Sequence, residues 1–210
     1  MVDGGANLPV KTVIAGACDT LTSATVLLDA DGGANDLDET IAPTTALPFS
    51  FAFFGTAVSH FAASSNGYVQ LLTSASGGTT QQPFPQVIPW SFAPDGLIAP
   101  LWDDLISVNT TALRTQVFGT GSTRHLTLEW KDWSFFNTTQ VERVTFQVKL
   151  FETTNAIELH YCTLAANGGT TTYEQGFNAS VGIEALNGTQ GVQHSYRGPV
   201  LSTGTALHFE

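Results

Sequence analysis

The chain has 210 residues, of which 42% are hydrophobic and only 12% charged, and its formal net charge is -11. Eighteen Asp and Glu against seven Lys and Arg repel nucleic acids and anionic lipids, so we expect neither as a partner. No apolar window approaches the length of a membrane-spanning helix, which predicts no membrane insertion, and the first residues lack the parts of a signal peptide. We therefore expect an excised soluble domain from a larger multidomain protein or assembly.

Apolar and polar residues alternate with a period of two along the chain, and no stretch carries a sustained helical stripe. This pattern predicts an all-β fold, a jelly-roll-like antiparallel sandwich of two sheets with about ten to twelve strands, in one domain over residues 1–210. The expected strands outside the hairpins discussed next are, in chain order, 23–29, 47–54, 58–64, 97–102, 114–119, 125–133, 178–185, 192–196 and 206–209.

Three tight turns are predicted between strands. Residues 143–151 alternate cleanly, and after Thr153–Asn155 the alternation resumes over 157–161, which is typical of a β-hairpin. The pairs Asn66-Gly67, before YVQLL, and Asn187-Gly188 supply the positive-φ residues that short hairpins require.

Residues 77–95 contain four prolines, at positions 83, 85, 89 and 94. Proline cannot donate a hydrogen bond to a neighbouring strand. This segment is therefore predicted to be an extended surface loop.

Cys18 and Cys162 are the two cysteines of the chain. We expect one disulfide that ties the first strand region to a late one, with two free core thiols as the alternative. Few lysines and abundant Thr and Gly favour an oxidising, extracellular or cell-surface location.

Five ordered stretches, LPFSFAFFG, SSNGYVQL, APDGLIAPLWDDL, VTFQVKLFETTNAIELHYC and SVGIEALNGTQGVQHSY, resemble a β-sandwich module of large secreted or surface-attached bacterial proteins. This module is distantly similar to the extracellular domain named after nidogen. The resemblance covers roughly residues 45–209 and leaves residues 1–40, with their expected N-terminal strands and acidic loop, unmatched. It implies a non-catalytic part of an adhesive or matrix protein, with no ligand specified.

The densest acidic segment, LLDADGGANDLDET, holds Asp29, Asp31, Asp36, Asp38 and Glu39 in a loop that contains glycine. Such a loop can gather carboxylates and carbonyls around Ca²⁺, so these aspartates are candidate metal ligands. The segment does not follow the EF-hand pattern, and a solvated acidic turn is an equally weighted alternative.

Asp103 and Asp104 follow the apolar run that ends at Trp102. Neighbouring residues on a strand point to opposite faces, which disfavours a cooperating acid–base pair. A polar strand end is the first interpretation, and a Ca²⁺ ligand is the second.

Glu129, Glu158 and Glu184 lie on expected strands and offer the carboxylates of a sandwich-fold glycoside hydrolase, which is the weakest functional alternative. Nothing in their spacing pairs them, and alternation predicts that they point outward to solvent. The chain carries no GxSxG, Walker, GxGxxG or HExxH motif. We therefore predict a protein that is not an enzyme.

Aromatic residues in expected loops form the candidate contact surface. Trp90 lies in the proline-rich segment, and Trp133 and Phe135 lie where WKDWSFFN is expected to turn. Flat aromatic rings bind protein surfaces or the apolar faces of sugars. The function predicted from the sequence is an extracellular binding, adhesion or matrix module with a protein or glycan ligand, and Ca²⁺ is the cofactor considered for its stabilisation. The alternative is a carbohydrate-binding domain.

Overall fold

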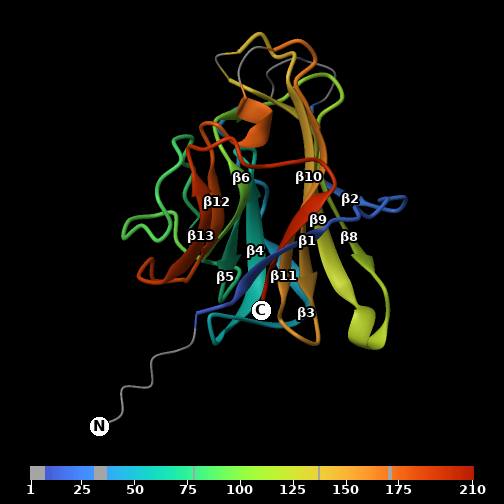
Figure 1. Cartoon of the computed structure of the whole chain (residues 1–210). Helices are drawn as coiled ribbons and strands as arrows, with labels where there is room; N and C mark the ends of the chain where they lie inside the picture. The colour runs from blue at the N-terminus through green and yellow to red at the C-terminus, as the bar shows by residue number, and fades with distance from the viewer. Residues whose placement is uncertain (1–7, 31–36, 78, 137, 170–171) are drawn as a thin grey trace.

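The computed structural model describes residues 8–30, 37–77, 79–136, 138–169 and 172–210. Two antiparallel sheets pack face to face (Figure 1). The eight-stranded sheet has the order β1-β14-β11-β10-β9-β8-β2, with β7 paired to β9, and the six-stranded sheet has the order β13-β12-β6-β5-β4-β3. The prediction of an all-β, two-sheet fold is confirmed.

The strands of the eight-stranded sheet are β1 (Lys11–Ala15), β2 (Thr25–Asp29), β7 (Leu105–Ile106), β8 (Ala112–Phe118), β9 (His125–Phe135), β10 (Arg143–Phe151), β11 (Ile157–Ala165) and β14 (Thr205–Phe209). Those of the six-stranded sheet are β3 (Thr45–Phe53), β4 (Thr56–Ser64), β5 (Tyr68–Leu72), β6 (Leu97–Trp102), β12 (Ser180–Glu184) and β13 (Gly191–Tyr196). The described residues thus form 14 strands rather than ten to twelve, because the sequence pattern did not locate the short strands β1 and β7.

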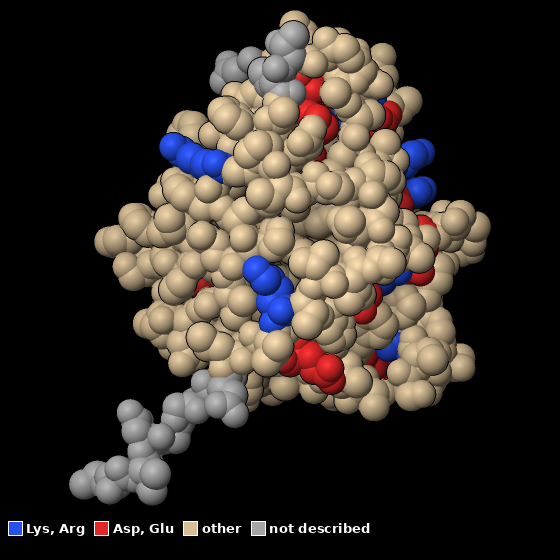
Figure 2. Space-filling model, viewed as in Figure 1, with Lys and Arg blue, Asp and Glu red and all other residues tan. Residues whose placement is uncertain are grey.

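Helical structure in the described residues is limited to two single 3₁₀ turns, η1 (Gly121–Thr123) and η2 (Tyr173–Gln175). Among those residues no helix is long and apolar enough to cross a membrane. Charged side chains are sparse on the face shown in Figure 2.

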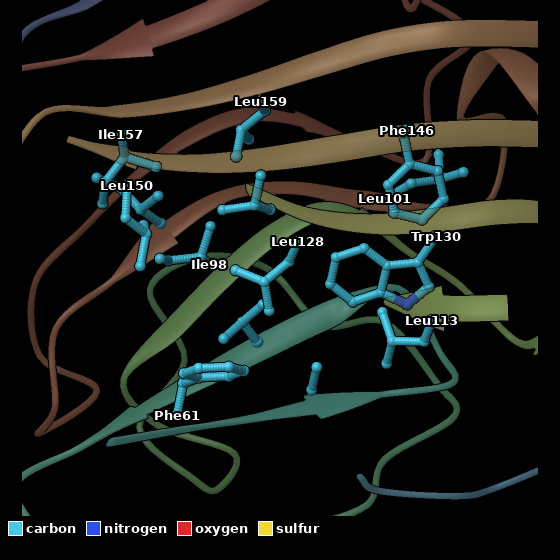
Figure 3. Packing of buried hydrophobic residues seen from close by; sticks show 14 of the residues in the cluster. Phe61, Ile98, Leu101, Leu113, Leu128, Trp130, Phe146, Leu150, Ile157 and Leu159 are labelled. Atoms are coloured by element: carbon cyan, nitrogen blue, oxygen red, sulfur yellow. The ribbon is translucent and has the colours of Figure 1, made fainter. Parts of the chain in front are cut away.

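The core lies between the inner faces of the sheets, where the predicted alternation places the apolar side chains (Figure 3). Trp130 of β9 stacks on Phe146 of β10, with ring centroids 5.1 Å apart. Its indole N–H donates a hydrogen bond to the carbonyl of Ser64, on the opposite sheet, at 2.8 Å. Burial of a large aromatic side chain therefore also fixes the position of one sheet on the other.

The three predicted hairpins are confirmed as β4–β5, β10–β11 and β12–β13. Gly67 has a φ of 73°, and a Cβ there would lie only 2.0 Å from the carbonyl oxygen of Leu101. No other residue type fits this position without moving the backbone.

A segment that we call the strap, residues 16–21, crosses the outer face of the eight-stranded sheet between β1 and β2. It is held there by a disulfide from Cys18 to Cys162 on β11, with a Cα–Cα distance of 5.7 Å, as predicted. The backbone of Asp19 exchanges two hydrogen bonds with the side-chain amide of Gln147, and Lys149 Nζ donates to the carbonyl of Ala17. Outward-facing Gln147 and Lys149 are consequently buried.

The proline-rich loop, residues 79–95 without a strand, covers the outer face of the six-stranded sheet in the same way (green, at the left of Figure 1). Side chains that point outward from this sheet donate hydrogen bonds to the backbone of the loop. The indole of Trp102 donates to the carbonyl of Gln82 at 2.9 Å, and the hydroxyl of Tyr68 donates to that of Thr80 at 2.7 Å. The predicted surface loop is therefore fixed on the sheet by hydrogen bonds rather than by a strand pairing.

Candidate functional site

Three carboxylates meet at the end of the sandwich that carries the β4–β5 turn. Asp38, Glu39 and Asp104 each offer a side-chain oxygen, and these oxygens lie within 4.8 Å of one another. We call this group the Asp104 cluster. Two oxygens on opposite sides of one Ca²⁺ are separated by about 4.6–5.2 Å, so the spacing suits a single ion.

The β4–β5 turn positions both parts of the cluster. Thr40 donates its backbone N–H to the hydroxyl of Ser65 at 3.0 Å and accepts the backbone N–H of Ser65 at 2.8 Å. On the other side, the side-chain oxygen of Asn66 accepts the backbone N–H of Leu105 at 3.1 Å. The acidic segment and Asp104 are therefore both fixed against residues 64–67, all of which are buried.

The cluster carries an excess of negative charge. Asp38 Oδ1 and Asp104 Oδ1 are buried and accept no hydrogen bond, whereas Glu39 accepts bonds from the amides of Asn66 and Gln81. Burial, together with the charges of Glu39 and Asp38, raises the pKa of Asp104 to about 6. No Lys, Arg or His in the described part of the chain forms an ion pair with these three carboxylates. Such an arrangement has the chemistry of a site for a hard cation.

The other four predicted metal ligands are not members of the Asp104 cluster as the structure describes it. Asp29 is exposed at the end of β2 and is not part of the Asp104 cluster, and Asp31 and Asp36 lie outside the described residues. Asp103 is buried, and its Oδ1 accepts the backbone N–H of Asp104 at 2.9 Å and the amide of Asn178 at 2.8 Å. Asp103 thus closes a turn at the end of β6, and its burial raises its pKa to about 6.

Two of the three predicted contact aromatics are not on a loop. Trp133 and Phe135 belong to β9 and are 0% and 1% exposed, so their assignment to a contact surface is wrong. The cause is a bulge. Val144 and Phe146 of β10 pair with Trp133 and Trp130, so that two residues of β9, Lys131 and Asp132, face the single Thr145 of β10. Asp132, with a φ of 61°, takes up the extra residue, and both tryptophans point inward.

Trp90 is partly exposed in the proline-rich loop, as expected, and its ring lies 5.4 Å from that of Phe92. Phe92 and Phe84 on the same loop are 66% and 63% exposed, and Val87 between them is also exposed. We call Phe84, Val87, Trp90 and Phe92 the aromatic loop surface. The two phenylalanines were not predicted as contact residues, although Phe84 lies between Pro83 and Pro85 and Phe92 lies two residues before Pro94, where proline keeps the chain out of a strand.

The three glutamates considered for glycoside hydrolysis lie on outer faces, as alternation predicts, but two of them are buried rather than solvated. Glu129 pairs with Arg114 at 2.5 Å, and Glu158 accepts bonds from two histidines, both on the eight-stranded sheet. Glu184 lies on the outer face of the other sheet, and its burial and the charge of Asp95 raise its pKa to about 7. The core of the sandwich therefore separates Glu184 from Glu129 and Glu158. Because the two carboxylates of a glycoside hydrolase must face the same cleft, Glu184 cannot pair with either of the other two.

Comparisons with known proteins place these features in a family. A model described as "NIDO related" matches residues 12–208. The match therefore extends to β1, the strap and β2, which the five sequence motifs do not include. No curated protein and no solved structure matches the chain. Because the family model covers nearly the whole domain, the chain belongs to the NIDO-related family.

Proposed function

We propose that this domain is an extracellular, non-catalytic binding module that contacts its ligand through the aromatic loop surface. The exposed rings of Phe84 and Phe92 on a loop that is fixed to a sheet are the observation that carries this proposal. The family supports a non-catalytic role, and the disulfide supports an oxidising compartment.

The proline-rich loop is suited to binding because its shape is set before the ligand arrives. Ile88 donates its backbone N–H to the side chain of Gln193 at 2.8 Å, and Ser180 donates its hydroxyl to the carbonyl of Gln86. A loop that is ordered in advance loses little conformational entropy on binding, and exposed aromatic rings supply the contact area. Protein and glycan ligands both use such surfaces.

The test is binding to a printed glycan array and to a panel of immobilised matrix glycoproteins. We expect Trp90→Ala and Phe92→Ala to weaken binding at least tenfold while the fold is retained. Phe177→Ala, which removes another half-exposed aromatic outside the loop, is the matched control. Glycan binding that is lost in the loop variants favours the carbohydrate-binding alternative, whereas equal binding by the wild type and the loop variants contradicts the proposed surface.

We further propose that the Asp104 cluster binds Ca²⁺. Three carboxylates supply three of the roughly 6–8 oxygens that Ca²⁺ takes, and water supplies others. An all-oxygen site disfavours zinc and copper, which prefer nitrogen and sulfur ligands. The acidic segment and the end of β6 would then be joined through the ion in addition to their contacts with the β4–β5 turn.

Isothermal titration with Ca²⁺ tests this site. The double variant Asp38→Asn/Asp104→Asn should lose one equivalent of bound Ca²⁺. Asp29→Asn, an equal change of charge at an exposed position outside the cluster, should bind as the wild type does. Unchanged stoichiometry and affinity in the double variant would show that the cluster is only an acidic surface.

A further inference from the structure

A second pair of carboxylates lies beneath the proline-rich loop. Glu184, the last residue of β12, is 0% exposed. Its Oε2 accepts the backbone N–H of Trp90 at 2.6 Å, while its Oε1 is buried without a hydrogen-bond partner. Asp95, at the end of the loop, lies close enough for its charge to act on Glu184, and its Oδ1 is also buried without a partner.

The β12–β13 turn shows how closely the oxygens from the loop approach one another. A Cβ on Gly188 would lie 2.4 Å from Asp95 Oδ1 and 2.6 Å from the carbonyl oxygen of Trp90, so these two oxygens are at most about 5 Å apart. The missing side chain and the φ of 62° at Gly188 let the turn pass directly over them. The carboxylate oxygen of Asp95 and the carbonyl oxygen of Trp90 therefore converge under this turn, and Trp90 is the residue whose backbone N–H binds the buried Glu184.

We propose that Glu184, Asp95 and the carbonyl of Trp90 form a binding site for Ca²⁺ that is separate from the Asp104 cluster. Buried carboxylates that remain ionised are normally paired with a cation or bound to a metal. Of the ion pairs within the described ranges, none includes Glu184 or Asp95. All three donors are oxygens, which selects a hard cation over zinc.

The ion would join the loop to the sheet directly under the aromatic loop surface. Trp90 contributes both its N–H, to Glu184, and its carbonyl, to the ion, so binding fixes the backbone that carries one of the exposed rings. This site depends neither on the binding role of the loop nor on the Asp104 cluster, and the following experiments separate the three.

The first experiment is calcium titration of the Asp38→Asn/Asp104→Asn variant, in which the Asp104 cluster is disabled. We expect one remaining equivalent of Ca²⁺, bound at least tenfold more weakly when Glu184→Gln or Asp95→Asn is added. Glutamine keeps an acceptor for the Trp90 N–H, so the Glu184 variant should fold, which circular dichroism verifies. Glu210→Gln, an exposed glutamate distant in sequence from the site, is the control. No remaining Ca²⁺ binding, or binding unaffected by both substitutions, overturns the proposal.

The second experiment uses Tb³⁺ as a luminescent substitute for Ca²⁺, again in the Asp38→Asn/Asp104→Asn variant, so that emission from an ion at the Asp104 cluster is absent. An ion on the carbonyl of Trp90 lies near the indole of the same residue, so excitation of tryptophan should produce Tb³⁺ emission. Trp90→Phe, which keeps the backbone donor and acceptor, should remove most of that emission while the stoichiometry of Tb³⁺ stays the same. Emission that persists in Trp90→Phe or in Glu184→Gln places the ion elsewhere and contradicts the site.

Discussion

Cys18 is bonded to Cys162 across 144 positions of sequence, and this bond attaches the strap to the middle of the eight-stranded sheet. The strap has no strand of its own. It is held by the disulfide and by polar contacts to side chains that a sandwich normally exposes to solvent. The disulfide is therefore part of what covers this outer face.

We expect removal of the disulfide to destabilise the domain strongly. The bond closes a loop of more than a hundred residues, and loss of such a bond costs about 2–5 kcal/mol. Urea unfolding of Cys18→Ser/Cys162→Ser, compared with the wild type in the presence and absence of reductant, measures this cost. Equal stability of the reduced and oxidised wild type would show that the disulfide does not stabilise the domain.

The environment of Asp19 makes the free energy of unfolding depend on pH. Burial opposes the charge of Asp19, but hydrogen bonds from His125, Thr127 and Lys149 outweigh it and hold the pKa of Asp19 well below its ordinary value of 3.8. A lowered carboxyl pKa stabilises the fold above that ordinary value, and the contribution is lost as the pH falls below it. Asp19→Asn should therefore cost about 1.5–3 kcal/mol at pH 7 and progressively less below pH 4. Urea midpoints of both proteins across this range provide the check, and a pH-independent difference would contradict it.

Truncation of a buried aromatic residue and of an exposed one should change the stability of the domain by different amounts. Trp133→Ala empties a fully buried site and should cost about 3–5 kcal/mol, so its loss of binding would carry no information about a contact surface. Phe92→Ala removes a mostly exposed ring and should change stability by no more than about 0.5 kcal/mol. Thermal unfolding of the two variants gives the comparison, and similar melting temperatures would contradict the assignment of Trp133 to the core.

Much of the fold is predictable from the sequence because strand periodicity and turn chemistry are local. The alternation of residues 143–151 and the Asn-Gly pairs were sufficient to predict three hairpins. The bulge at Asp132 was not predictable, since it depends on how β9 pairs with β10. That single irregularity moved Trp133 and Phe135 from an expected surface to the core.

The candidate site was only partly predictable, because its members come from distant segments. Asp38 and Asp104 were each proposed as metal ligands, but in two separate groups, and only the fold brings them together with Glu39. The burial of the outer faces could not be predicted from the sequence either. Alternation places Gln147 and Glu184 in solvent and does not indicate which segments cover them. A contact between two irregular segments and two sheets leaves no periodic pattern in the sequence.

The claim that calcium holds the acidic end of this domain is tested most directly by the melting temperature of the wild type and of Asp38→Asn/Asp104→Asn, each in chelator and in Ca²⁺. A ligand of the native state at a hundred times its Kd stabilises by about 2.7 kcal/mol. We expect Ca²⁺ to raise the melting temperature of the wild type, chelator to reverse the rise, and the double variant to respond less. A wild-type melting temperature that is the same in chelator and in millimolar Ca²⁺ would contradict this account.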